Sequence, residues 1–569
     1  MRIDATWRRI HGVFADPVLR RWLLREGLPR LPDLDRRLPP YLEGKFPCLL
    51  ETPRGRFAEL ASPYPESSFP LRLPGECLLV EPGAEDTLFD RQFADVETGP
   101  ALHRFAWLPL LGNAADPAWV TALWGAWRER FGEPSEGIAW HPYTAAERAI
   151  NILDFGRRIG LPAPLDDTLA VLAAHGPAIA ERLEYFGDHN TSNHLANNGR
   201  GLYLLGLTLG MERCAALGSR ILIEEAKRIF LPSGVLREGS GHYHLLLARQ
   251  YASTWLAARA HGRSEASELE EITRRAMSVI PHLRLPGGAP LIGDISPDCP
   301  PDHLVGLFPG ACMKEGWTSL LAEHDRALLG DLITSCGTAA PEALAADGWL
   351  RADHGPWSGL WHADPAGWSQ MPGHGHQDMG GFELHHHDEP LFIDVGRGSY
   401  NRPGESDPEV AARAHNTLTV DEKDPYPPNK PYYDNAFRRR VAGPPPELRH
   451  EADGVSLRHH GFSRLKGIGA VERGWRFREG GFSIEDSVKG MGRHRVTRLL
   501  HTPLEVSPAA DGVVLTGRGG HFLVRADAPV DLEAVTRWTA YGEGQAATRL
   551  RIDVRAHLPW QGRLRVEKI

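Results

Sequence analysis

The sequence predicts a chain of two unlike parts, a helical region followed by an all-β region that packs as an antiparallel sandwich. Apolar residues recur at i, i+3 and i+4 before about residue 345, and at every second position after it. The 569 residues also exceed the length of one ordinary domain. Because helices and strands are separated along the chain, an alternating α/β fold is excluded. We therefore expect a helical domain over 91–340 and a β domain over 345–569.

Helical periodicity marks a series of segments of ordinary length before residue 345. They span residues 118–131, 145–159, 166–186, 193–209, 220–230, 242–261 and 265–280. Proline, glycine and aspartate separate them by short loops, which favours antiparallel pairs of neighbouring helices. Residues 1–90 are rich in proline and mixed in pattern, and we expect an N-terminal extension that packs on the helical domain.

Period-two segments with frequent turns follow. They span residues 380–386, 390–395, 416–420, 454–459, 470–478, 482–488, 495–501, 512–517, 521–526 and 549–556. A hairpin that turns at Asp388-Glu389 would place Glu383 opposite Asp394. Two facing carboxylates favour a cation or a strong base between them, and a solvated acidic pair is the equal alternative.

Composition excludes several functional classes. Hydrophobic residues make up 42% and charged residues 24%, as in ordinary globular proteins. The net charge of −9 argues against a nucleic-acid-binding protein, although a local basic groove would still accept a polyanionic glycan. The six cysteines lack CxxC spacing, so neither a disulfide framework nor a cysteine zinc site is expected.

The N-terminus lacks the pattern of a signal peptide, and no run of about 18 apolar residues occurs. We therefore expect no membrane insertion and a cytoplasmic protein, or a periplasmic or secreted one if a leader was removed. The sequence leaves the oligomeric state open, with a homodimer as one option.

The most informative segment is Gly-His-Gly-His-Gln-Asp at residues 373–378. If this segment is extended, His374 and His376 point to the same side. Together with Asp394 and His415 they form a histidine and aspartate set that is typical of zinc sites. If His376 binds a metal, His374 remains free to act as a base. Surface histidines are the alternative, because the chain contains 27 of them.

Two further segments contain polar side chains at the beginnings of helices. Asn193, His194 and Asn197 lie within one turn near the start of a leucine-rich helix, which suggests a cleft. Helix capping is the alternative, but it accounts for only one of these residues. Tyr243 follows the loop Arg237–His242, where a tyrosine near cations can act as a general acid or base. A buried tyrosine with a satisfied hydroxyl is the alternative.

Weaker candidates lie elsewhere in the helical region. Arg148 would clamp a sugar carboxylate, although a surface salt bridge is the more common role for an arginine. Trp140 would stack on a sugar ring, although core packing is the commoner role for a tryptophan. Asp294 and Asp298 mark a turn at the end of the helical region.

Three ordered motifs resemble the C-terminal domain of the heparinase II/III-like polysaccharide lyases. They are Gly-His-Gly-His-Gln-Asp-Met-Gly-Gly-Phe-Glu-Leu from Gly373, Pro-Leu-Phe-Ile-Asp-Val-Gly from Pro390, and Ala-His-Asn-Thr-Leu-Thr-Val-Asp from Ala414. Asn193-His194 and the segment Glu238–Tyr243 resemble helical-domain motifs of the same family.

This resemblance implies an (α/α) toroid, an incomplete barrel of helical hairpins, followed by an antiparallel β-sandwich. It implies cleavage of a uronate-containing acidic polysaccharide, such as a glycosaminoglycan, by β-elimination. Tyr243 would be the catalytic acid and base, His374 its partner base, and Asn193 or His194 would neutralise the uronate carboxylate.

The resemblance also implies the remaining site residues. His376, Asp394 and His415 would hold a structural Zn²⁺. The residues expected to contact the substrate are Asn197, Arg148, Trp140, Glu238 and His242. Asn197 stands where some members carry Glu or Arg, which leaves the sugar and its stereochemistry undefined. The alternatives are a glycan-binding or processing protein of a surface-polysaccharide system with little lyase activity, and a zinc-dependent glycan hydrolase.

Overall fold

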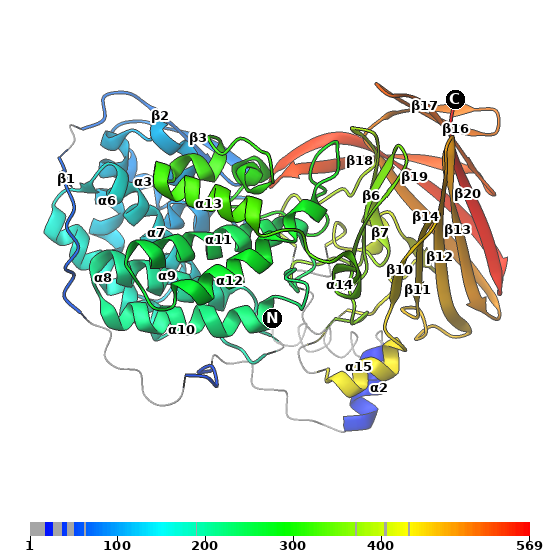
Figure 1. The fold of residues 1–569 in the computed structure, drawn as a ribbon, viewed down its shortest axis with the longest axis horizontal. Coiled ribbons are helices and arrows are strands. Elements are labelled where there is room, and N and C mark those ends of the chain that lie inside the picture. Colours follow the sequence, from blue (N-terminus) through cyan, green and yellow to red (C-terminus); the bar gives the residue numbers. More distant parts are fainter. Residues whose placement is uncertain are drawn as a thin grey trace.

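The structure, a computed structural model, describes residues 17–26, 37–42, 51–61, 64–188, 190–369, 373–402, 407–428, 430 and 433–569. Helices occupy the first part of the chain and antiparallel sheets the second, and the two regions lie side by side (Figure 1). The predicted order of a helical region followed by antiparallel sheets is therefore confirmed.

The helices agree with the predicted segments to within a few residues for most of the helical region. The described α-helices are α2 (Pro17–Glu26), α3 (Glu85–Leu88), α4 (Thr98–Arg104), α5 (Trp107–Leu111), α6 (Pro117–Phe131), α7 (Pro142–Arg158), α8 (Leu165–Ala180), α9 (His194–Leu209), α10 (Glu212–Ile229), α11 (Gly241–Ala260), α12 (Ala266–Met277), α13 (Glu323–Ser335), α14 (Pro341–Ala346) and α15 (Asn435–Ala442). The largest differences are that α8 ends at Ala180 instead of residue 186 and that α10 begins at Glu212 instead of residue 220.

The described strands of the second region form three antiparallel sheets. Their strand orders are β5-β6-β7-β8, β18-β19-β14-β9 and β10-β11-β12-β13-β20-β17-β16-β15. The strands are β5 (Trp349–His354), β6 (Trp357–His362), β7 (Gly381–His386), β8 (Glu389–Phe392), β9 (Leu418–Val420), β10 (Glu447–Glu451), β11 (Gly454–His459), β12 (Ile468–Arg478), β13 (Gly481–Gly490), β14 (Arg493–Thr502), β15 (Glu505–Ala509), β16 (Gly512–Gly517), β17 (Gly520–Ala526), β18 (Val530–Ala540), β19 (Glu543–His557) and β20 (Trp560–Lys568).

The N-terminal extension is divided between the two regions. Helix α2 packs on the β region beside α15, where the ring centroids of Trp22 and Tyr433 are 6.0 Å apart (Figure 1), so the prediction that the extension packs on the helical domain is wrong for this helix. The strands of the extension do pack on the helical region. Strand β1 (Glu59–Leu60) pairs in parallel with β4 (Leu161–Pro162), and β2 (Phe69–Leu73) pairs with β3 (Glu76–Val80). Residues 1–16, 27–36, 43–50 and 62–63 of the predicted extension lie outside the described residues. None of the described helices is long and apolar enough to span a membrane.

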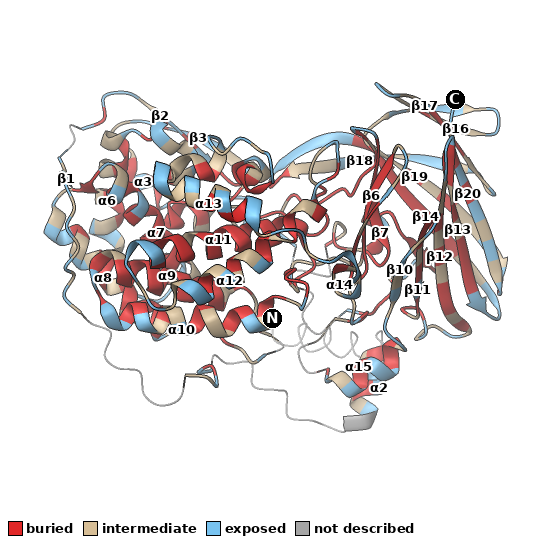
Figure 2. Cartoon of the chain, in the orientation of Figure 1, coloured by how far each residue is buried: buried red, intermediate tan, exposed pale blue. Residues whose placement is uncertain are grey.

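Helix α11 lies in the interior of the helical region. Nearly all of its residues are buried (Figure 2), as expected for a helix with apolar side chains on every face. Its first turn is fixed by Ser240, whose Oγ accepts a hydrogen bond from the backbone N–H of Tyr243 at 3.1 Å. The sequence therefore places Tyr243 in the capped first turn of a buried helix.

The predicted register of the 382–395 hairpin is wrong. The turn is His387-Asp388, since His386 pairs with Glu389, and a shift then places Leu384 opposite Phe392 instead of residue 393. The left-handed backbone of His387, with φ of 52°, permits this tight turn. Glu383 still approaches Asp394, because the backbone N–H of Asp394 donates to Glu383 Oε1 at 3.1 Å.

Candidate functional site

The two regions meet where the loop 373–378 contacts the start of α11. The backbone N–H of His374 donates to the Glu238 carbonyl at 3.0 Å, and the N–H of Asp294 donates to the His374 carbonyl at 2.9 Å. A Cβ on Gly239 would lie 2.9 Å from Gly375 Cα, so glycine is needed for this approach. These contacts bring residues from both regions into one site.

Asp294 is the central carboxylate of this site. Its oxygens lie 3.1 Å from His374 Nδ1 and 2.8 Å from His376 Nε2, and Arg397 Nη1 donates to both at 3.2 and 3.3 Å. Burial raises the pKa of Asp294, but the hydrogen bonds and charges of the two histidines outweigh it and hold the pKa below its usual range. Asp294 therefore stays charged and fixes both imidazoles.

Tyr243 stacks directly on His374. Their ring centroids are 3.4 Å apart and their planes differ by 13°. The Tyr243 hydroxyl lies 3.1 Å from that of Tyr400, which donates to the carbonyl of Ile295 at 2.9 Å. Because the Tyr400 proton is used by this carbonyl, Tyr243 donates to Tyr400. Burial raises the pKa of Tyr243 well above its usual value, so the phenol is neutral here.

His194 lies at the start of α9 and is held by Glu184. Its Nδ1 is 2.8 Å from Glu184 Oε1, and its ring packs on Tyr143 with centroids 4.5 Å apart. Asn193 beside it is buried, and its Oδ1 has no hydrogen-bond partner among the described residues. An unpaired buried amide oxygen is costly, which favours a polar ligand at this position.

Three residues predicted to contact the substrate, Glu238, His242 and Asn197, are buried. Glu238 is fully buried, both of its carboxylate oxygens lack a hydrogen bond among the described residues, and Oε2 is 3.6 Å from His374 Nε2. His242 Nδ1 accepts from the backbone N–H of Ser296 at 3.1 Å, and Asn197 Oδ1 accepts from Arg200 at 3.3 Å. All three side chains are buried, and that they contact the glycan stays a prediction.

The predictions for Arg148 and Trp140 are wrong. Both side chains are fully buried in the core of the helical region. Arg148 donates to the carbonyls of His103 and Ala139 at 3.0 and 2.6 Å, and its guanidinium lies over the Trp140 ring. Trp140 donates to the carbonyl of Phe131 at 2.7 Å. This cation–π pair stabilises the core and is not available to a polysaccharide.

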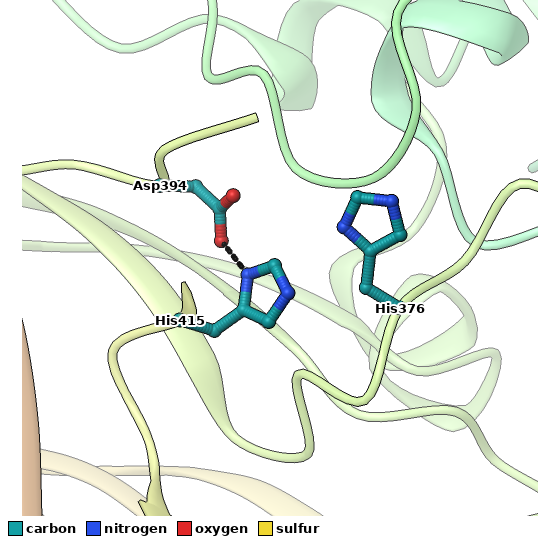
Figure 3. A group of neighbouring side chains, drawn as sticks. All are labelled: His376, Asp394 and His415. Carbon is teal, nitrogen blue, oxygen red and sulfur yellow. Dashed lines mark hydrogen bonds and ion pairs between the residues drawn. The ribbon is translucent and has the colours of Figure 1, made fainter. Parts of the chain in front are cut away.

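His376, Asp394 and His415 converge (Figure 3), and their potential ligand atoms lie within 4.8 Å of one another. His415 Nδ1 is 2.7 Å from Asp394 Oδ2, while His415 Nε2 and His376 Nδ1 are buried and have no hydrogen-bond partner in the described part of the chain. Two unpartnered imidazole nitrogens beside a carboxylate fit a divalent metal such as Zn²⁺.

Sequence reasoning missed Glu184, Arg397 and Tyr400, and it noted Asp294 only as a turn residue. Arg397 and Tyr400 follow the candidate ligand Asp394 by a few residues, and this proximity is a signal that could have found them. Glu184 lies in the connection between α8 and α9 and carries no such local signal.

Residues 337–564 match the family model of the heparinase II/III-like C-terminal domain. The resemblance predicted from the motifs is therefore confirmed for this part of the chain. A sequence search of curated proteins found no match.

Solved structures share the fold at low sequence identity. A heparinase III structure is 17% identical with a TM-score of 0.62, covering 84% of this chain and 79% of its own. The heparinase III BT4657 gene product is 18% identical with a TM-score of 0.56, covering 84% and 80%. The heparan sulfate lyase HepC from Pedobacter heparinus is 15% identical with a TM-score of 0.52, covering 90% and 84%.

Proposed function

We propose that this chain, whose C-terminal part is a heparinase II/III-like domain, is a polysaccharide lyase that cleaves a uronate-containing acidic polysaccharide by β-elimination. The observation that carries this proposal is the stacking of Tyr243 on His374, whose ring centroids are 3.4 Å apart. This contact brings the first turn of α11 against the loop 373–378 of the second region. The fold shared with heparinase III and heparan sulfate lyase supports the same reaction class.

The chemistry requires three kinds of group. Removal of the C5 proton of a uronate places negative charge on its carboxylate oxygens, which hydrogen-bond donors or cations must stabilise. A base accepts the C5 proton while the bond between C4 and O4 breaks, leaving a double bond between C4 and C5. An acid then supplies the proton that the departing O4 takes up.

The site residues fit these roles. The Asn193 amide and the His194 imidazole would hold the uronate carboxylate. The proton exchange with the sugar would be divided between two residues. His374 would accept the C5 proton, and Tyr243, a neutral phenol here, would give its proton to the departing O4. The bond from His374 Nδ1 to Asp294 at 3.1 Å leaves Nε2 as the ring nitrogen for that exchange. Tyr400, 3.1 Å from the Tyr243 hydroxyl, would hold the phenol in place.

His376, Asp394 and His415 would hold one Zn²⁺ at the end of the β region. The ion would supply structural stabilisation, cross-linking the loop 373–378 to the segments that carry Asp394 and His415. We also propose that the helical region is an incomplete (α/α) toroid over 91–340 and that the sheets of 345–569 form a sandwich. The glycan cleft would lie between them, where Tyr243 meets His374.

The test is to incubate the protein with a panel of uronate polysaccharides and to follow the ultraviolet absorbance of unsaturated uronate. We expect absorbance to grow with the unsubstituted protein and to vanish in Tyr243→Phe, which keeps the ring that stacks on His374. Trp140→Phe, a substitution in the distant core, is the matched aromatic control and should stay active. New reducing ends without absorbance would show that the protein is a hydrolase and not a lyase. Binding of a glycan without any product would show a glycan-binding role instead.

A further inference from the structure

Strands β14 and β19 extend beyond their neighbours at one end of the four-stranded sheet. β9 pairs with β14 from Val496 to Arg498, and β18 pairs with β19 up to Ile552. Beyond these positions Arg495 lies directly opposite Arg555. Residues that lie directly opposite each other in antiparallel strands point to the same side of the sheet, so the two arginine side chains share one face.

Arg493 belongs to the same basic face. It precedes Arg495 by two residues on β14, and successive side chains of a strand alternate between the two faces of the sheet. The residue opposite Arg493 on β19 is His557 and not a carboxylate. Like charges that face each other across strands are unfavourable unless an opposite charge lies near them. The three arginines therefore favour a negative partner on this face.

Carboxylates of the chain itself neutralise one of the three arginines. Arg495 donates to Glu422 Oε1 and, at 2.6 Å, to Asp553 Oδ2. Arg493 and Arg555 are exposed, and neither forms an ion pair with a residue that the structure describes. The positive charges of these two side chains are therefore available to a negatively charged ligand.

The arginines line a surface hollow of about 450 Å³, a volume within the range of ligand sites. Its lining residues are Asp421, Glu422, Arg493, His494, Arg495 and Arg555. The Asp421 carboxylate lies 2.8 Å from His494 Nδ1 and accepts from the backbone N–H of Arg495 at 2.9 Å. Three arginines thus face two carboxylates that already have partners, on a chain whose net charge is −9. The hollow is a local basic site on an acidic protein.

We propose that Arg493 and Arg555 form a secondary binding site for an acidic polysaccharide, whose sulfate or carboxylate groups contact the two guanidinium groups. Guanidinium groups bind such anions through paired, charge-assisted hydrogen bonds. A polymer that repeats the anion gains several contacts on an open surface, whereas a single small anion is not enclosed there. The inference takes the class of ligand from the proposed function, but it concerns residues other than Tyr243 and His374.

The lining of the hollow favours a polysaccharide over a nucleic acid or a membrane. Among the described residues, no Phe, Tyr or Trp lines it, and proteins that bind single-stranded nucleic acid stack bases on such rings. The exposed apolar side chain of Met491 lies two residues before Arg493, and stable anchoring to a membrane requires a much larger apolar surface.

The test measures the affinity for long chains of heparan sulfate, chondroitin sulfate and alginate. Tyr243→Phe serves as the background, so that no chain is cleaved and the candidate active site is the same in every variant. We expect at least one polysaccharide to bind. Arg493→Gln and Arg555→Gln should each weaken its binding about threefold, and the double variant about tenfold, the size of exposed ionic contacts. Added salt should weaken binding less steeply in the double variant.

Two controls separate these contacts from a structural role. Replacing both arginines by lysine keeps the two charges and should retain most of the affinity. Arg449→Gln removes an exposed arginine of β10 that lies 2.6 Å from Glu447, and it should change the affinity less than twofold. Urea unfolding should show no loss of stability in the Arg493→Gln and Arg555→Gln double variant, because neither side chain has an ion pair with a described residue to lose.

Each outcome decides the inference. An unchanged affinity for every polysaccharide in the double variant would overturn it, even if the protein proves to be a lyase, and so would failure of all three polysaccharides to bind. If duplex DNA or phosphatidylserine vesicles lose binding in the double variant while no polysaccharide does, the site belongs to that ligand and the inference is overturned. Weakened polysaccharide binding would support it even if the unsubstituted protein releases no unsaturated uronate, in which case only the proposed lyase function fails.

Discussion

Asp294 and Glu184 are two buried carboxylates that each hold two imidazoles, yet their surroundings differ. The histidines on Asp294 have side chains 15% and 1% exposed, and the guanidinium of Arg397 is its third partner. The histidines on Glu184 have side chains 36% and 41% exposed, and its third partner is the neutral amide of Asn198.

This difference indicates that the two clusters have different roles. The Asp294 cluster is enclosed and charge-balanced, and it ties the candidate metal ligand His376 to His374 at the junction of the two regions. The Glu184 cluster is the more exposed of the two, because solvent reaches both of its imidazole side chains. We therefore expect the Asp294 cluster to determine the turnover rate and the rigidity of the site. We expect the Glu184 cluster to affect the affinity for the glycan.

The largest expected effect is that of Asp294→Asn. An amide cannot accept from both imidazoles and Arg397 as the carboxylate does, so His374 loses its orientation, and we expect kcat/KM for lyase turnover to fall about 10³-fold. The unfolding free energy should fall by about 1–3 kcal/mol, because both imidazoles and Arg397 lose a charged acceptor while Arg397 keeps its 3.1 Å bond to Asp407. Absorbance assays and urea unfolding measure the two effects. Activity within threefold of the unsubstituted protein would contradict this role.

Glu184 should contribute pH-dependent stability. Its pKa in the folded protein is about 2, lowered from 4.5, so the stabilisation is present above pH 4.5 and is lost as pH falls towards 2. The full loss is about 3 kcal/mol. Glu184→Gln should remove this acid-side decline, so its stability deficit in urea unfolding should shrink between neutral pH and about pH 3. An equal deficit at both values would show that the carboxylate charge is not the cause.

Affinity for zinc should depend on the carboxylate of Asp294 and not on that of Glu184. Asp294 fixes the ring of His376 through Nε2 at 2.8 Å, and loss of such a partner lowers zinc affinity about 10- to 100-fold. Asp294→Asn should show this reduction in competition with a chromophoric chelator, whereas Glu184→Gln, the matched control, should bind zinc as the unsubstituted protein does. A protein that binds no zinc in this assay would remove the proposed metal site.

The smallest catalytic effect should come from Arg148→Met. The substitution leaves the carbonyls of His103 and Ala139 without a donor and should destabilise the protein by about 1–3 kcal/mol. Because Arg148 lies in the core, KM for the glycan should stay within twofold. A large increase in KM with normal stability would restore the discarded role of this arginine in substrate binding.

Much of the architecture could be predicted because it depends on local patterns. Apolar spacing gave α9 and α11 to within one residue at each end, and the ordered motifs identified His376, Asp394 and His415 as a set. Strands β18 and β20 were missed, although Leu564 and Val566 of β20 alternate with charged residues and carry the period-two signal of a strand.

Partners that are distant in sequence could not be predicted. Glu184 contacts His141 because of how the helices pack, and Asp294 contacts His376 across the junction of the two regions. Residue spacing in the sequence predicts neither contact. Arg148 and Trp140 were misread for the same reason, because an arginine near a tryptophan forms a core cation–π pair as readily as a sugar subsite.

The central claim is that Tyr243 and His374 form an elimination site, and mass spectrometry of a defined uronate oligosaccharide after incubation tests it most directly. Elimination adds no water, so the two products together should weigh the same as the substrate, one of them carrying the C4–C5 double bond, and Tyr243→Phe should yield neither. Products that together weigh one water more than the substrate would contradict the account.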